Sequence, residues 1–205
     1  MTKVLIVDDH ASLRDSFRAA FESGGGFCVV GETPDAACAA AFCQQLSPDL
    51  VLMDVCTEGG SSGLEATQQL KQQFPGIRVI VMSGFDEISY APRAREAGAD
   101  AFVYKSKSMG FFLQVARGVM EGRSWFPEPK TIPLPTGEAP LTDREMEILR
   151  LICKYKSRKE IAEELFIQPD TVKYHISNML GKTGCASAAE LAIMMISNGW
   201  INPKY

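Results

Sequence analysis

The sequence has no apolar stretch long enough to cross a membrane. None of its hydrophobic runs approaches the roughly 20 residues that a transmembrane helix requires, and the chain enters a strand-like apolar segment almost at its first residue. We therefore expect neither a membrane span nor a secretory signal peptide. With 46% hydrophobic residues over 205 positions, the composition is that of an ordinary globular protein of one or two domains.

The cysteines show neither a C-x-x-C pair nor the spacing of metal ligands. We interpret them as reduced, mostly buried thiols, which indicates a cytoplasmic protein. An alternative is a redox-sensing thiol, for which Cys56 is the candidate because it lies two residues after Asp54. The six cysteines are Cys28, Cys38, Cys43, Cys56, Cys153 and Cys185.

A basic charge excess is also absent. The net charge is −4, and the acidic excess lies in the first two thirds of the chain, whereas the last third is neutral. Bulk charge therefore does not mark the chain as a nucleic-acid binder. The sequence contains no internal repeats.

Three aspartates follow two short apolar runs. Lys3-Val-Leu-Ile-Val7 leads into Asp8 and Asp9, and Leu50-Val-Leu-Met53 leads into Asp54. Such runs are typical of strands buried on both faces, and parallel neighbouring strands would bring all three carboxylates to the sheet edge where ligands bind. Clustered carboxylates repel one another unless a cation lies among them. Mg²⁺ prefers such oxygen ligands and assists phosphoryl transfer. The alternative is that each Asp only caps the following helix.

Strand and helix patterns alternate five times over residues 1–122. This alternation predicts an α/β fold, a doubly wound five-stranded parallel sheet covered by helices on both faces. Thr33 and Pro34 have the residue types that begin a helix. The predicted strands are 3–8, 27–31, 49–54, 77–83 and 101–105, and the predicted helices are 10–23, 34–46, 63–74, a segment near 86–97, and 107–122.

Residues 123–140 are rich in proline, which predicts an extended linker between two domains. Residues 141–205 have an all-helical pattern. Three matches to the capping box and a proline at a helix start predict a small bundle of four helices, and the turn Phe166-Ile-Gln-Pro169 makes two of them a helix-turn-helix candidate. The capping boxes are Thr142–Glu145, Ser157–Glu160 and Ser187–Glu190, and the proline is Pro169.

The segment from Thr171 to Ala189 contains no acidic residue. A helix over 171–182 would present an acid-free polar face that can enter a major groove. A second basic cluster, formed by Lys154, Lys156, Arg158 and Lys159, suits phosphate contacts. A merely solvated surface is an equally good interpretation of the lysine cluster alone.

Together, these motifs resemble a known family over nearly the whole chain. Residues 1–122 are similar to the receiver domain of two-component response regulators, and residues 141–205 resemble a LuxR-type helix-turn-helix domain, which is the NarL/FixJ class. The receiver motifs are the aspartates together with Ser83 and Lys105 at the ends of two strands. The second-domain motifs are Leu141-Thr-x-Arg144-Glu145, Lys159-Glu-Ile-Ala162, Thr171-Val-Lys173-x-His175 and Lys182-x-Gly184.

The resemblance implies a role for each receiver residue. Asp54 would accept a phosphoryl group from a sensor histidine kinase, with Mg²⁺ bound by Asp8, Asp9, Asp54 and the backbone carbonyl of Cys56. Lys105 and the Ser83 hydroxyl would contact the phosphoryl oxygens. Ser83 and the aromatic Phe102 would form the switch that responds to phosphorylation. For Phe102, ordinary core packing is the alternative.

The resemblance also implies DNA as a partner and a homodimer in the active state. Thr171, Lys173 and Lys182 would contact phosphates, with Lys159 from the basic cluster. Lys173, Tyr174 and Ser177 would face the bases.

Three departures from the family pattern stand out. The loop after Asp54 has Thr57 and Glu58 where the family usually has Met and Pro, and it is rich in glycine, so we expect a flexible loop and slower phosphorylation. Pro92 interrupts a helix segment, so we expect a short helix that starts near this residue. In the second domain, Gln168 replaces a common Ser cap and Ala188 a common Arg, which should weaken a local contact but not the fold.

Our leading hypothesis is a phosphorylation-controlled, DNA-binding transcription regulator that is not an enzyme beyond its own phosphorylation and dephosphorylation. A second hypothesis keeps DNA binding and makes the receiver a phosphorylation-independent dimerisation or protein-interaction module. A third, a hydrolase with Asp54 as nucleophile, is disfavoured because no general acid or base lies near the motif.

Overall fold

The structure is a computed structural model that describes residues 1–85, 87–128, 132, 134–135 and 139–203. The chain divides into two compact units, the first built from residues 1–84 and 89–129 and the second from residues 85–88 and 130–204. Parts of the proline-rich stretch predicted as a linker, including Pro129 and Pro133, lie outside the described residues.

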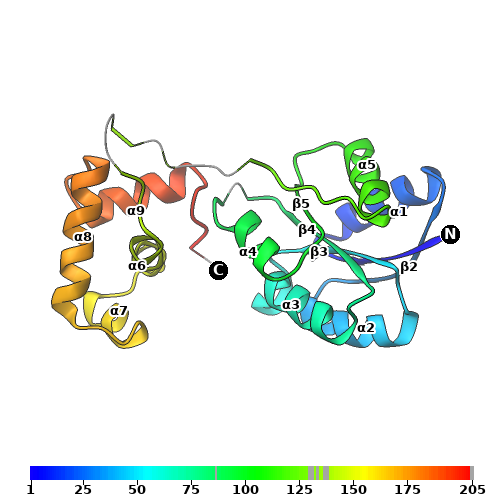
Figure 1. Ribbon diagram of the computed structural model, residues 1–205, viewed down its shortest axis with the longest axis horizontal. Helices are drawn as coiled ribbons and strands as arrows, with labels where there is room; N and C mark the ends of the chain where they lie inside the picture. The colour runs from blue at the N-terminus through cyan, green and yellow to red at the C-terminus, as the bar shows by residue number, and fades with distance from the viewer. Residues whose placement is uncertain (86, 129–131, 133, 136–138, 204–205) are drawn as a thin grey trace. The chain divides into compact units, whose positions relative to one another are not determined.

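The first unit is built on a five-stranded parallel sheet with the strand order β2-β1-β3-β4-β5 (Figure 1). The residues from Val4 to Val7 and from Leu50 to Met53 are fully buried, as expected for strands covered on both faces. The prediction of a doubly wound parallel sheet is confirmed. The strands are β1 (Thr2–Val7), β2 (Phe27–Thr33), β3 (Leu50–Asp54), β4 (Arg78–Ser83) and β5 (Ala101–Tyr104).

Helices cover both faces of this sheet. On one face, α1 (Ala11–Ser23) and α5 (Met109–Met120) pack their aromatic residues against one set of strand side chains. On the other face, α2, α3 and α4 pack against the alternate set, as the period of two along a strand requires. These three helices are α2 (Ala39–Leu46), α3 (Gly63–Gln73) and α4 (Tyr90–Glu96).

Two predicted helix starts differ from the structure. The second helix does not begin at Pro34, because Thr33 extends β2 opposite Val7, and Asp35 caps a short 3-10 turn over Ala36–Cys38 before α2. The fourth helix is short, as predicted, but it starts two residues before Pro92. A proline is tolerated there because the amides of the first helical turn have no intrahelical partner.

The first residues of the segment predicted as a linker belong to the first unit. Trp125 forms a parallel bridge with Ala101 at the edge of the sheet, and its carbonyl accepts a hydrogen bond of 2.9 Å from the amide of Phe102. The guanidinium of Arg95 lies 4.3 Å above the ring of Phe126. Trp125 and Phe126, which follow the predicted boundary at residue 122, therefore pack against the first unit.

The second unit contains four helices among the described residues, and they enclose their own apolar core. Both bonds of the capping box are present at Thr142 and at Ser157. At Ser187, the hydroxyl accepts from the amide of Glu190, but the Glu190 carboxylate accepts from the amide of Ala186 instead. The helices are α6 (Asp143–Cys153), α7 (Arg158–Glu164), α8 (Pro169–Thr183) and α9 (Ala188–Ser197).

Two turns of this unit hold aromatic residues in left-handed backbone conformations. Tyr155, between α6 and α7, has a φ of 61°, and Phe166, between α7 and α8, has a φ of 54°. Both side chains are almost fully exposed.

Within the described residues, no single helix is long and apolar enough to span a membrane. The bent pair of α8 and α9 meets the criterion by length and composition alone.

Candidate functional site: an acidic pocket and a helix-turn-helix

The carboxylates of Asp8 and Asp54 meet because their strands are neighbours. β1 and β3 run parallel with Val7 opposite Met53, so the two aspartates that follow lie side by side at the carboxyl edge of the sheet. Asp8 and Asp54 are buried, whereas Asp9 is exposed. One ligand atom from each of Asp8, Asp9, His10 and Asp54 lies within 4.8 Å of the others. The structure thus brings the three predicted aspartates together.

Lys105 lies between the two buried carboxylates. Its ammonium is 2.7 Å from Oδ2 of Asp8 and 2.7 Å from Oδ2 of Asp54. The backbone fixes its place, because the amide of Lys105 donates to the carbonyl of Ser83 across the β4–β5 ladder. Burial alone lowers the pKa of Lys105, but attraction to Asp54 and then Asp8 outweighs it and holds the pKa above its ordinary value. Lys105 is therefore a fixed positive charge in the pocket.

Burial raises the pKa of Asp54 to about 7. The ammonium of Lys105 opposes this rise, and the negative charges of Asp8 and Asp9 add to it. The three carboxylates therefore outnumber the single ammonium of Lys105, so the ionised form of Asp54 is disfavoured in the pocket.

A divalent cation fits this pocket. Oδ2 of Asp8 is buried. This oxygen forms an ion pair with Lys105, but among the described residues it accepts no hydrogen bond of good geometry. The donors are carboxylate oxygens, with the His10 imidazole at the rim, and hard cations prefer oxygen ligands. Asp8, Asp9 and Asp54 are therefore the residues that would hold such an ion.

Ser83 and Phe102, the predicted switch residues, lie on β4, which pairs with β3, and on β5, which pairs with β4. Ser83 ends β4 opposite Tyr104 and is buried. Phe102 is fully buried, and its ring meets that of Tyr104 edge to face at a centroid distance of 5.1 Å. Phe102 therefore packs inward, and its amide links it to Trp125.

The start of the loop after Asp54 is anchored by hydrogen bonds. The hydroxyl of Thr57 accepts from the amide of Ala36 at 3.0 Å and donates to the carbonyl of Ser61 at 2.9 Å. The amide of Glu58 donates to the carbonyl of Pro34. Thr57 itself is buried. Thr57 therefore anchors the start of this loop, which the glycines around it did not indicate, and the flexibility of the rest of the loop stays a prediction.

Gly63 is a position at this site that the sequence argument missed. A Cβ atom there would lie 1.8 Å from the carbonyl oxygen of Asp54, so only glycine lets the start of α3 approach the end of β3. The amide of Gly63 donates to the carbonyl of Val55 at 2.9 Å. Its place in a glycine-rich loop was the only signal in the sequence.

Cys56 follows in the same loop and is buried, with its thiol 3.7 Å from the hydroxyl of Tyr90 on α4. It also forms an isolated bridge with Ser62. The use of its backbone carbonyl as a metal ligand stays a prediction. The burial of the thiol disfavours the alternative of a redox sensor.

His10 is the second residue that the sequence argument did not assign to the pocket. It precedes the first turn of α1 as the N-cap residue. Its Nδ1 lies 2.6 Å from Asp9 and 3.4 Å from Asp8. Its position directly after the acidic pair was the available signal.

In the second unit, α8 presents an exposed polar face. Lys173, Tyr174 and Ser177 are exposed on it, and Thr171 is partly exposed. The Tyr174 ring meets that of His175 edge to face at 5.7 Å. The residues predicted to face the bases therefore share one accessible surface.

Lys182 and Lys159 differ from that group. Lys182 pairs with the buried carboxylate of Glu145 at 2.7 Å and donates to the carbonyl of Pro140 at 3.2 Å. Burial alone raises the pKa of Glu145, but the bonds from Lys182 and Thr142 outweigh it and lower the pKa. Lys159 is exposed and lies 4.0 Å from Glu163. Lys182 therefore joins α6 to α8, while Lys159 remains available at the surface.

Family models match both parts of the chain. The model of the response regulator receiver domain matches residues 4–116, and that of the bacterial regulatory proteins of the luxR family matches residues 139–195. The chain therefore belongs to the two-component response regulators that join a receiver to a LuxR-type DNA-binding domain. One of its relatives is named as a transcriptional regulatory protein.

Two relatives extend over most of the chain. The transcriptional regulatory protein LiaR of Bacillus subtilis is 32% identical over 98% of this chain and 100% of its own length. The response regulator protein VraR of Staphylococcus aureus is 37% identical over 88% of this chain and 89% of its own.

Solved structures agree with this fold. A LuxR-family response regulator from Aurantimonas sp. SI85-9A1 is 30% identical, covering 61% of this chain and 89% of its own, with a TM-score of 0.58. RcsB of Salmonella enterica serovar Typhimurium, described as bound to promoter rprA in the presence of the phosphomimetic BeF3-, is 20% identical, covering 96% of this chain and 99% of its own, with a TM-score of 0.64.

Proposed function

We propose that Asp54 accepts a phosphoryl group from a sensor histidine kinase and that this modification controls DNA binding. The single observation that carries the proposal is the ammonium of Lys105, held 2.7 Å from both Asp54 and Asp8 in a buried pocket. In the transfer, a carboxylate oxygen of Asp54 forms a bond to phosphorus while the bond from phosphorus to the histidine nitrogen of the kinase breaks. The phosphoryl group is later lost by hydrolysis at the same pocket.

Each pocket residue has a role in this reaction. Lys105 pairs with the phosphoryl oxygens and the Ser83 hydroxyl donates to them, because a phosphoaspartate needs cationic and hydrogen-bonding partners. Asp8, Asp9, Asp54 and the backbone carbonyl of Cys56 would hold a Mg²⁺ ion, which would supply neutralisation of charge on the transferring oxygens.

The switch residues connect this chemistry to output. When Ser83 turns toward the phosphoryl group, Phe102 moves into the space that it leaves. The amide of Phe102 bonds the carbonyl of Trp125, so this movement acts on the segment that leads out of the receiver. A local charge change thereby biases a two-state element.

The second domain binds DNA through the exposed face of α8. Lys173, Tyr174 and Ser177 face the bases, and Thr171 and Lys159 contact phosphates. Lys182 reaches phosphates only if it leaves Glu145. The RcsB structures include one described as two RcsB dimers bound to two parallel DNAs, and we extend this assembly to the present chain as an active homodimer in the cytoplasm.

DNA affinity with and without a phosphodonor tests the proposal. Full-length protein and the Asp54→Asn variant are titrated with a labelled promoter library, with Mg²⁺ and acetyl phosphate present or omitted. We expect the donor to raise the affinity of the natural chain and to leave that of Asp54→Asn unchanged. Equal affinity in all four conditions would instead support a receiver that acts without phosphorylation.

A further inference from the structure

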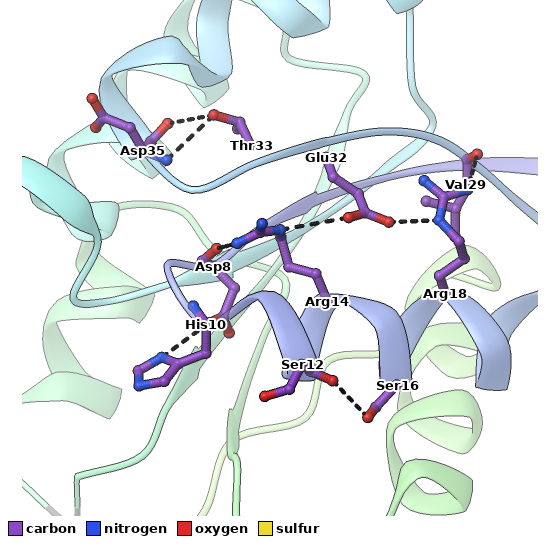
Figure 2. A network of polar contacts seen from close by, with 10 residues as sticks. All are labelled: Asp8, His10, Ser12, Arg14, Ser16, Arg18, Val29, Glu32, Thr33 and Asp35. Atoms are coloured by element: carbon purple, nitrogen blue, oxygen red, sulfur yellow. Dashed lines mark hydrogen bonds and ion pairs between the residues drawn. The ribbon is translucent and has the colours of Figure 1, made fainter.

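The turn that carries Asp8 and Asp9 is held from two sides by groups outside the pocket. On one side, the amide of Asp8 donates to the carbonyl of Thr33 on β2 at 3.1 Å. On the other side, Nη1 of Arg14 donates to the carbonyl of Asp8 at 2.7 Å (Figure 2). The backbone amide and the backbone carbonyl of Asp8 are thus both fixed, and the direction of the Asp8 side chain is fixed with them.

Arg14 also forms an ion pair with Glu32, although its Nε makes no hydrogen bond among the described residues. Arg14 lies in the first turns of α1, and its side chain is only 17% exposed. Its Nε lies 3.5 Å from Oε2 of Glu32, which is on β2 next to Ile6 of β1. The other oxygen of Glu32 accepts from Nε of Arg18 at 2.6 Å. Glu32 therefore receives two guanidinium groups from one face of α1 (Figure 2).

The two arginines differ in the one respect that matters for the pocket. Arg14 bonds the carbonyl of Asp8, whereas Arg18 bonds the carbonyl of Val29 at 3.3 Å and the carboxylate of Glu22 at 3.2 Å. Both carry one positive charge and both share Glu32. Only Arg14 reaches the turn that presents the acidic side chains.

We infer that Arg14 is a positioning residue for the cation site, with Glu32 as its ion-pair partner. It does not touch the ion. It fixes the peptide of Asp8, so that the carboxylates of Asp8 and Asp9 are directed at the pocket before an ion arrives. Groups that orient metal ligands in this way raise metal affinity by about tenfold or more. The inference rests on the proposed use of the pocket for Mg²⁺.

Charge alone predicts the opposite effect. Arg14 is a cation near an acidic pocket, so its removal would strengthen the binding of a divalent cation if only Coulomb interactions mattered. A loss of affinity on removing Arg14 therefore indicates positioning. Arg18→Met is the matched control. It removes an equal positive charge that pairs with the same Glu32, and Arg18 makes no bond to Asp8.

The experiment is a calorimetric titration of full-length, unphosphorylated protein with Mg²⁺ alone. We expect Arg14→Met to weaken Mg²⁺ binding about tenfold and Arg18→Met to change it by less than about twofold. In acetyl phosphate labelling, we expect Arg14→Met to be slow at low Mg²⁺ and to recover at saturating Mg²⁺, which a general loss of folding would not do. If Arg14→Met does not fold, Arg14→Gln provides the same test, because the shorter amide does not reach the Asp8 carbonyl.

Unchanged or tighter Mg²⁺ binding by a folded Arg14 variant would overturn the inference and leave Arg14 as a link between α1 and β2. This outcome is distinguishable from failure of the proposed function. If the natural chain binds Mg²⁺ but takes no phosphoryl group, the proposed function fails while the positioning role of Arg14 is still measured.

Discussion

The raised pKa of Asp54 predicts that Mg²⁺ binding depends on pH near neutrality. Burial places this pKa at about 7, so the carboxyl is about one tenth ionised near pH 6 and about nine tenths ionised near pH 8. A cation binds the ionised form, since ligands must lose their protons. Apparent Mg²⁺ affinity should therefore rise about tenfold over this interval.

The assay is calorimetric titration of the full chain with Mg²⁺ at the two pH values, in buffers of different ionisation enthalpy. We expect proton release on binding near pH 6 and much less near pH 8. Asp54→Asn removes the titrating group, so its weaker binding should have no such pH dependence. Equal affinity of the natural chain at both values, or the same slope in Asp54→Asn, would refute the reasoning.

The same proton linkage acts on folding in a definite direction. A carboxyl whose pKa is higher in the folded state than its ordinary value favours folding while it is protonated. Without Mg²⁺, the stabilisation from Asp54 is full below a pH of about 3.8 and is lost as the pH rises through about 7. A bound cation offsets that loss.

Three further predictions concern single side chains. Tyr155→Gly should raise the free energy of unfolding of the second unit by about 0.5–1 kcal/mol in urea titrations, because glycine adopts the left-handed conformation without strain; a decrease would show that the ring stabilises the turn. Thr57→Val should slow acetyl phosphate labelling and Thr57→Ser should not, because only the valine variant loses the hydroxyl that anchors the loop. Equal labelling rates in the two variants would show that this hydroxyl does not affect phosphorylation. Lys182→Met should lower the free energy of unfolding of the second unit by about 2 kcal/mol, because it leaves the buried Glu145 carboxylate without its ammonium partner. Lys173→Met should weaken DNA binding and reduce its salt dependence while leaving stability unchanged. The opposite pattern in the two variants would contradict these assignments.

The sheet and the second-domain helices could be predicted because their signals are local. Each buried strand reads as a continuous apolar run, as from Val4 to Val7, and a capping box places a helix start within one residue, as at Thr142. The convergence of Asp8 and Asp54 followed from strand adjacency alone.

What could not be predicted depends on contacts between distant parts of the chain. Thr33 has the residue type of a helix cap but continues a strand because β1 pairs with it. Thr57 looks like part of a flexible loop in the sequence. Its hydroxyl accepts a hydrogen bond from the amide of Ala36, a residue 21 positions away in the sequence. The link from Arg14 to Asp8 has no sequence signature, because an arginine on an amphipathic helix usually faces solvent. Lys182 has the charge of a phosphate contact but lies opposite Glu145, 37 residues away.

The most direct test of the account is intact-mass measurement of the full chain after incubation with Mg²⁺ and acetyl phosphate, followed by peptide mapping. The account predicts the gain of one phosphoryl group, located on Asp54, which is absent from Asp54→Asn and abolished by chelating the metal. A natural chain that remains unmodified, or that carries its phosphoryl group on another residue, would contradict it.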